Sequence, residues 1–311
     1  MSFSHRAEQR GDRLVDILTD ETEGLRVAVS RLGAELVSMA RRDISGGWFG
    51  FLYRDNDLTP PAGGWANHAT VMGYFLHRLK DGRSSYRGRE IAGGTHSFLR
   101  TKIWQKVESE DPGSLSYRIE PGDYSETEYP LKVGLTLTYR LANGAVVTTF
   151  EFVNGEPELT AHLEFGLHPG FAASTFDSFH FEMPAGRYRR WFSPNNYLSG
   201  ETQDIDFAGG EMPFERSKLA GSYILEFVDV PDGRFVYRDP PSRREVALDL
   251  AAAPYFTLWS DGGPFLCVEP CWGLTDRDDQ RPFELKDGIQ TIPARGTLTA
   301  SFTMKPRMIP S

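Results

Sequence analysis

The stretch HLEFGLHPGF, residues 162–171, combines a strand pattern with side chains that can move protons. Three apolar residues alternate with His162, Glu164 and His168, so a strand here would turn the two histidines and the glutamate to one face. An imidazole titrates near neutrality and suits general acid–base catalysis. Because Pro169 follows directly, the pattern alone is explained more simply by a polar residue at the end of a strand.

The segment PFLCVEPCWGLTD, residues 264–276, contains a carboxylate in an unusual setting. Glu269 lies in a strand pattern that is apolar on both faces, and a charge there needs a partner or a polar cavity. Pro270 cannot donate a hydrogen bond to a sheet, which predicts that Glu269 lies at the end of a strand, where a cleft can open. The pattern is equally consistent with a structural and a functional glutamate.

The remaining histidines and aromatic residues are weaker candidates. His77 precedes Arg78, and His96 lies in GGTHSFLR, whereas the surroundings of the other histidines suggest no particular chemistry. An aromatic ring such as that of Trp272 can pack against the C–H face of a sugar, although a role in the core is commoner for any single ring.

Composition excludes several classes of function. The chain has 311 residues, 40% of them apolar and 25% charged, with a net charge of −9. No basic excess is available to neutralise phosphates, so we expect neither a nucleic acid nor a membrane surface as a partner. The two cysteines, Cys267 and Cys271, have no second pair and no histidine beside them in the chain, which predicts neither a zinc site nor a disulfide framework. With no apolar leader and no long apolar run, the expected location is the cytoplasm.

Period-2 patterns dominate the chain and define the elements that must position these residues. LKVGLTLTYRL (residues 131–141) and TLTASFTM (residues 297–304) alternate cleanly, and Asn143-Gly144 is a hairpin signal between two such runs. Helical periodicity is nearly absent. We therefore predict an all-β protein, a large antiparallel β-sandwich formed by one domain over residues 1–311.

Several segments in a fixed order resemble the aldose 1-epimerase (galactose mutarotase) family. The resemblance runs over roughly residues 25–305, and each motif is weak by itself. The segments are RVAVSRLGAELVSMARRD (residues 26–43), VMGYFLHRLKDGRSSYRGREI (71–91), THSFLR (95–100), GLHPGF (166–171), VEPCWGLTD (268–276) and KDGIQTIPARGTL (286–298).

The resemblance implies a galactose mutarotase-like supersandwich that interconverts the α and β anomers of an aldose, without a metal or organic cofactor. His168 would be the general acid and Glu269 the general base. The substrate-binding residues would be Arg78, His96, Asp232 (with Asp229 as its competitor) and Trp272. The expected partner is a small-molecule aldose, and the protein would be a monomer or a homodimer.

The chain departs from the family motifs at three places. His77 occupies a position before Arg78 that is usually small, and Ser97 replaces the glycine of a His-Gly-Phe motif. Cys271 stands between the proline and tryptophan of a Glu-Pro-Trp motif, which moves Trp272 one residue along and, in a strand, to the opposite face.

Three alternatives remain open at the level of the sequence. A glycosidase would need two carboxylates, for which Glu164 and Glu269 are the available pair. A hexose-6-phosphate 1-epimerase would need additional basic residues in the cleft, such as Arg100 or Arg78. A non-catalytic sugar-binding protein would use the same scaffold without the chemistry.

Overall fold

The computed structural model describes residues 2–213 and 215–310. Within these residues the strands pair antiparallel, and the helical segments are short 3-10 turns with no α-helix. The prediction of an all-β antiparallel architecture is thus confirmed. None of the helical segments in the described part of the chain is long and apolar enough to cross a membrane.

The described strands form four sheets. The N-terminal sheet contains β1 (Phe3–Arg10), β2 (Arg13–Asp20), β3 (Leu25–Ser30), β4 (Glu35–Arg42) and β5 (Trp48–Gly50). The nine-stranded sheet has the order β17 (Gly210–Glu211), β14 (His180–Met183), β19 (Arg234–Asp239), β20 (Arg244–Asp249), β24 (Thr297–Met308), β12 (Ala145–Asn154), β11 (Val133–Ala142), β10 (Ser114–Ile119) and β9 (Gln105–Val107).

The eight-stranded sheet carries the residues of interest. Its order is β16 (Thr202–Phe207), β15 (Gly186–Trp191), β18 (Tyr223–Asp229), β21 (Tyr255–Trp259), β22 (Phe265–Trp272), β13 (Ala161–Ala172) and β23 (Gln290–Ile292), with β6 (Ala69–Tyr74) also pairing with β13. A small hairpin joins β7 (Arg83–Tyr86) to β8 (Arg89–Ala92). The 3-10 turns are Lys80–Gly82, Leu99–Thr101, Arg216–Gly221, Pro240–Ser242 and Phe283–Leu285.

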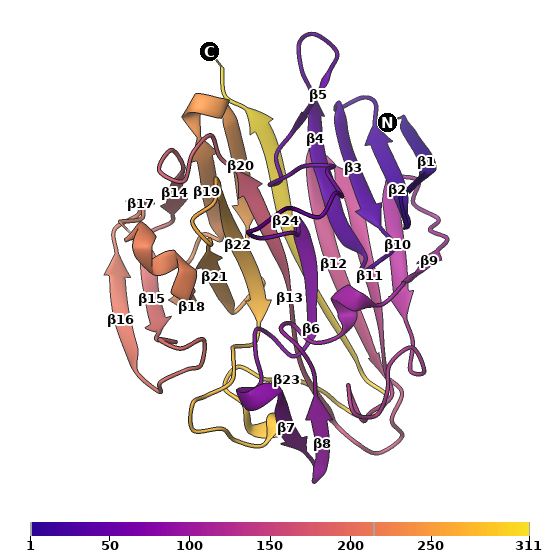
Figure 1. Ribbon diagram of the computed structural model, residues 1–311, viewed down its shortest axis with the longest axis vertical. Helices are drawn as coiled ribbons and strands as arrows, with labels where there is room; N and C mark the ends of the chain where they lie inside the picture. The colour runs from indigo at the N-terminus through magenta and orange to yellow at the C-terminus, as the bar shows by residue number, and fades with distance from the viewer. Residues whose placement is uncertain (1, 214, 311) are drawn as a thin grey trace.

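The two large sheets pack against each other as in a sandwich (Figure 1). Aromatic side chains from both sheets meet between them. The ring of Phe165 on β13 lies 4.6 Å from that of Phe152 on β12, measured between centroids. Farther along, Phe256 on β21 lies 5.1 Å from Phe235 on β19. Each such ring removes a large apolar area from water, so this interior is the main source of stability.

The hairpin between β11 and β12 shows how local sequence builds these sheets. In β11 the buried residues alternate with partly exposed ones, as the sequence pattern predicts. Asn143 and Gly144 both take positive φ, 52° and 70°. A two-residue turn of this kind matches the right-handed twist of the flanking strands, and asparagine and glycine tolerate it best.

His168 and Glu269 lie within their strands, not at strand ends. β13 continues through Pro169 to Ala172, and β22 continues through Pro270 to Trp272. The expectation that each proline terminates its strand is therefore wrong. The two prolines nevertheless interrupt the pairing of β13 with β22. The strands pair at Gly166↔Cys271 and again at Gly170↔Cys267, but no residues of these two strands pair with each other between those positions. A proline lacks the N–H that a ladder requires, so the sheet loosens locally without ending.

Gly166 permits the close approach of the two strands beside this interruption. A Cβ atom at this position would overlap the carbonyl oxygen of Pro270 on the facing strand. Since that oxygen belongs to backbone inside a packed sheet, it cannot move aside cheaply. The glycine therefore fixes the register that places His168 opposite Glu269.

Replacing Gly166 by alanine should lower the free energy of unfolding by about 1–3 kcal/mol, because the added methyl group forces the strands apart. Equilibrium unfolding in denaturant measures this difference. Gly221 is the matched control: a Cβ there meets open space, so Gly221→Ala should stay within about 0.5 kcal/mol of the parent. Equal stabilities of the two variants would contradict the role assigned to Gly166.

Candidate active site

His168 and Glu269 contact each other directly from neighbouring strands. The distance from Nε2 of His168 to Oε1 of Glu269 is 3.2 Å, and the side chains are 7% and 1% exposed. The second atoms of both groups, His168 Nδ1 and Glu269 Oε2, are buried and have no hydrogen-bond partner among the described residues. Two proton-transfer groups thus lie side by side, and each has unused hydrogen-bonding capacity.

Burial shifts the pKa values of this pair in opposite directions. Loss of water lowers the pKa of His168 to about 3, with repulsion from His77 and Arg100 adding to the effect. Burial also raises the pKa of the Glu269 carboxyl well above its usual range. Both shifts favour the uncharged forms, so at neutral pH the empty pair holds one transferable proton, mainly on the carboxyl group.

A cavity of about 260 Å³ opens over the pair. Two tryptophans form much of its apolar wall: Trp65 stacks on His168 with ring centroids 5.0 Å apart, and Trp259 meets the same imidazole edge-on at 5.6 Å. Gly170 provides room for the first of these rings, since a Cβ there would overlap Trp65. The polar lining includes Asn67, Thr95, Ser193, Asn196, Ser222 and Thr275.

Hydrogen bonding fixes the tautomer of His96, which lines the same cavity. The backbone N–H of His77 donates to Nδ1 of His96 at 3.2 Å, so that nitrogen carries no proton. Burial holds the pKa of His96 well below its usual value, and the ring is therefore neutral. A neutral imidazole with a bare Nδ1 must carry its proton on Nε2, which makes His96 a hydrogen-bond donor through that atom.

His77 and the two arginines complete the ionisable lining. Burial, reinforced by Lys286 and Arg78, lowers the pKa of His77 to about 4, so its ring is neutral at neutral pH. Arg78 and Arg100 both line the cavity, and no hydrogen bond or ion pair of either guanidinium group is found among the described residues. Glu269 is the one carboxylate in the described lining, so the cavity is locally cationic although the whole chain is acidic.

A family model described as aldose 1-epimerase matches residues 16–273 of this sequence. The chain belongs to the aldose 1-epimerase family. A search of curated proteins finds no match.

Solved structures support the same fold for this family member. A galactose mutarotase related enzyme from Lactobacillus acidophilus superposes with a TM-score of 0.80 at 21% identity, covering 99% of this chain and 100% of that one. A galactose mutarotase-like protein from Lactobacillus casei gives 0.80 at 18% identity over 98% and 100%. A galactose 1-epimerase from L. acidophilus gives 0.72 at 11% identity, with 99% of each chain covered. The predicted galactose mutarotase-like fold is thereby confirmed.

Four of the six predicted site residues of this epimerase family member meet at the cavity: His168, Glu269, Arg78 and His96. Asp232 does not line it; the residue is exposed in the turn after β18 and accepts a hydrogen bond from the backbone of Arg234. Its competitor Asp229 is exposed on β18 and does not line it either.

Trp272 points into the sandwich, away from the cavity. Its ring stacks on Phe165 at 4.9 Å, and its Nε1–H donates to the carbonyl oxygen of Ala252 at 3.0 Å. The cause is the extra residue before it: Cys271 takes the strand position two residues from Glu269, on the same face, and Trp272 faces the opposite way.

The other polar residues of the opening stretch have structural partners. Glu164 is buried against Lys286 at 3.0 Å and also accepts hydrogen bonds from the backbone of Leu76 and Leu274. It does not line the cavity, so it offers no second carboxylate for a glycosidase. The backbone N–H of His162 donates to the hydroxyl of Tyr86 at 2.9 Å, away from the described lining.

The two cavity tryptophans were missed at the level of the sequence. Trp65 lies in a loop rich in glycine and proline, and its backbone N–H donates to Asp261 at 2.8 Å. Trp259 is on β21, next to β22, where Trp259 pairs with Cys267. A large ring in a Gly/Pro-rich loop was a usable signal for Trp65, whereas the role of Trp259 depends on strand order, which no local pattern reveals.

The backbone conformation at Ser97 is one that favours glycine, the residue that the family motif has at this position. Its φ is +62°, in the left-handed region that disfavours side chains, and its hydroxyl is buried without a partner among the described residues. Ser97 does not line the cavity of this epimerase family member, so the serine does not narrow it.

Ser97→Gly should therefore raise the free energy of unfolding by about 1 kcal/mol, because it relieves backbone strain. Ser84 is the matched control: its hydroxyl is also buried and unpartnered, but it lies in the extended strand β7. Ser84→Gly should not stabilise the protein, since glycine weakens a strand. Denaturant unfolding of both variants isolates the backbone effect, and equal changes would argue against strain at Ser97.

Proposed function

We propose that this protein is an aldose 1-epimerase, which interconverts the α and β anomers of an aldose by opening and reclosing the sugar ring. The observation that carries the proposal is the contact of 3.2 Å between His168 Nε2 and Glu269 Oε1 beside the cavity. Ring opening requires one proton to leave the C1 hydroxyl and another to reach the ring oxygen. An acid and a base held side by side meet that requirement.

In the forward direction, Glu269 as carboxylate removes the proton of the C1 hydroxyl while His168 as imidazolium protonates the ring oxygen. The bond between C1 and the ring oxygen breaks, and its electrons become the lone pair of the new hydroxyl. C1 becomes the carbonyl carbon of the open-chain aldehyde. Rotation about the C1–C2 bond then presents the other carbonyl face, and the ring closes with the two roles reversed.

The pKa shifts of the pair are consistent with this sequence of steps. The ion pair before ring opening and the neutral pair after it hold the same number of protons, so the cycle requires no exchange with solvent. Burial favours the neutral pair. The neutral pair is also the resting form, so the carboxyl proton of Glu269 must pass to His168 before ring opening, and the contact of 3.2 Å between Oε1 and Nε2 provides a direct path for that transfer.

The remaining lining suits a sugar. His96 offers a hydrogen-bond donor through Nε2, and Arg78 offers an unpaired guanidinium group to hydroxyl oxygens. Trp65 and Trp259 supply apolar faces on which the C–H side of a pyranose can pack.

Glu269→Gln should reduce the rate of anomer exchange by about 10²–10⁴-fold, because the amide cannot accept the C1 proton, and His168→Gln should act similarly. Exchange between anomers is measured by NMR magnetisation transfer across a panel of aldoses, with the spontaneous rate subtracted.

His162→Gln is the matched control, since this histidine shares the strand of His168 but does not line the cavity. It should keep nearly the parent rate. Exchange at the parent rate in Glu269→Gln would refute the mechanism. Sugar binding to the parent protein, detected through tryptophan fluorescence but without faster exchange, would instead identify a non-catalytic binding protein.

A second candidate substrate is a hexose 6-phosphate, favoured by the unpaired Arg100 in the lining. A neutral aldose presents no anion to compensate two unpaired guanidinium groups in a half-enclosed cavity. A phosphate group does, and arginine binds it through two parallel hydrogen bonds.

Arg100→Gln should lower kcat/KM for a hexose 6-phosphate at least 10-fold more than kcat/KM for the free hexose, because it removes about 1.4 kcal/mol or more of charge-assisted binding. The matched control is Lys102→Gln, a nearby cation that is instead paired with Glu128 at 2.9 Å. An unchanged ratio of the two kcat/KM values in Arg100→Gln would rule out phosphate recognition by this residue.

A further inference from the structure

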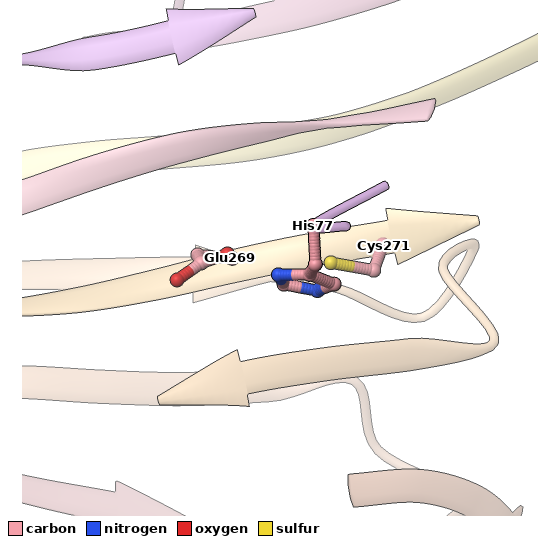
Figure 2. Close-up of side chains that lie close together, drawn as sticks. All are labelled: His77, Glu269 and Cys271. Atoms are coloured by element: carbon pink, nitrogen blue, oxygen red, sulfur yellow. The ribbon is translucent and has the colours of Figure 1, made fainter. Parts of the chain in front are cut away.

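Three side chains of metal-binding type gather beside the acid–base pair (Figure 2). They are His77, Glu269 and Cys271, and one nitrogen, one carboxylate oxygen and the sulfur all lie within 4.8 Å of one another. Glu269 and His77 line the cavity, whereas Cys271 is buried behind them. Figure 2 shows the thiol pointing toward the imidazole ring.

Two of these three residues are departures from the family motifs. Cys271 is the residue inserted before Trp272, and it follows Glu269 by two positions on β22, so both side chains leave the same face of the sheet. His77 comes from the segment after β6, where a small residue is usual, and its φ of +52° is in the left-handed region. The cluster is therefore a feature of this chain's own sequence, and the spacing of the two cysteines offered no hint of it.

Each of the three groups has a ligand atom to spare. His168 contacts Oε1 of Glu269, whereas Oε2 is buried and has no partner among the described residues. A ring nitrogen of His77 lies within the cluster, and a neutral imidazole is a common metal ligand. Cys271 is a free thiol whose hydrogen-bond contact is a long one, 4.0 Å to the hydroxyl of Thr257.

We propose that His77, Glu269 and Cys271 form a binding site for Zn²⁺. Imidazole nitrogen, thiolate sulfur and carboxylate oxygen are the three protein ligand types of zinc, and three protein ligands leave a fourth tetrahedral position for water or a sugar oxygen from the cavity. Tetrahedral zinc holds its ligand atoms roughly 3.5 Å apart. The three atoms lie within 4.8 Å of one another, so they must move closer together to bind zinc.

Charge balance supports the same ion. A thiolate and a carboxylate together neutralise Zn²⁺, so the filled site carries no net charge in a buried place. Binding displaces the thiol proton and any carboxyl proton to solvent, and therefore strengthens as the pH rises. Hard cations such as Mg²⁺ prefer oxygen ligands and should bind far more weakly.

The occupied site would stop epimerisation, because zinc ties up the carboxylate that must accept the C1 proton. The protein would then be active without zinc and inhibited by it, with activity restored by a chelator. The binding itself does not depend on the proposed function, whereas the inhibition does.

Calorimetric titration of the full-length protein with Zn²⁺ tests the binding. One ion per chain is expected, and Mg²⁺ should give no comparable heat. Titration with Co²⁺ reports the sulfur ligand directly, because cobalt bound to thiolate shows a near-ultraviolet charge-transfer band. Absence of both signals in the parent protein would overturn the proposal.

Cys271→Ala should weaken zinc binding by about 100-fold or more and abolish the cobalt–thiolate band. Cys267→Ala is the matched control: Cys267 is a buried free thiol on the same strand but lies outside the cluster. It should bind both metals as the parent does. Loss of the cobalt band in Cys267→Ala with retention in Cys271→Ala would refute the assignment.

Anomer exchange provides a separate measurement. Cys271→Ala should keep its basal rate and resist zinc at concentrations that inhibit the parent and Cys267→Ala. Equal inhibition of all three would place the inhibitory zinc elsewhere and overturn the inference. If no aldose is turned over at all, the proposed function fails, while the calorimetric and cobalt measurements still decide whether the site exists.

Discussion

The pairing of β13 with β22 is the constraint on which the candidate site depends. These strands bring His168 and Glu269 to 3.2 Å from each other although the two residues lie far apart in the chain. Gly166 lets the backbones approach, and Pro169 and Pro270 interrupt the ladder at the level of the pair. With a continuous backbone hydrogen-bond ladder, His168 and Glu269 would be an ordinary cross-strand pair in a regular sheet. The interruption instead leaves two polar groups with unused hydrogen-bonding atoms next to a cavity.

Low polarity around this pair shapes its chemistry. In water a histidine and a glutamate would both be charged at pH 6, and their attraction would be weak. Burial favours the neutral forms, so at neutral pH the transferable proton is held mainly by the Glu269 carboxyl. Such a pair suits a reaction that only relocates protons and is reversible by nature. The guanidinium groups of Arg78 and Arg100, which have no ion-pair partner among the described residues, add a positive field to the cavity, which favours electron-rich ligands.

Much of the fold and part of the site could be predicted from the sequence. Alternation and Asx-Gly turns identify strands because side-chain period and turn geometry are local properties. Motifs around His168 and Glu269 pointed to these two residues, and the structure brings them into contact beside the cavity. Asp232 and Trp272 were placed by motif position alone. The one-residue insertion at Cys271 turns the side chain of Trp272 to the opposite face of the strand. The carboxylate of Asp232 instead accepts a hydrogen bond from the backbone N–H of Arg234 within the turn. The positions of Trp259 and of the cluster around His77 depend on which strands lie next to each other in the sheet. That order is set by residues far apart in the sequence, so no local pattern reveals it.

The way the loop of Trp65 is attached affects how the shape of this cavity can vary between related sequences. The backbone N–H of Trp65 donates to Asp261 in the turn between β21 and β22. The indole ring of Trp65 stacks on His168 and occupies the space that a side chain at position 170 would fill. The roof of the cavity is thus supported by a surface turn, while the reactive groups are anchored in the sheet interior. Changes in the length or composition of that turn can move the roof, and with it the shape of the cavity, without disturbing the strands that hold His168 and Glu269.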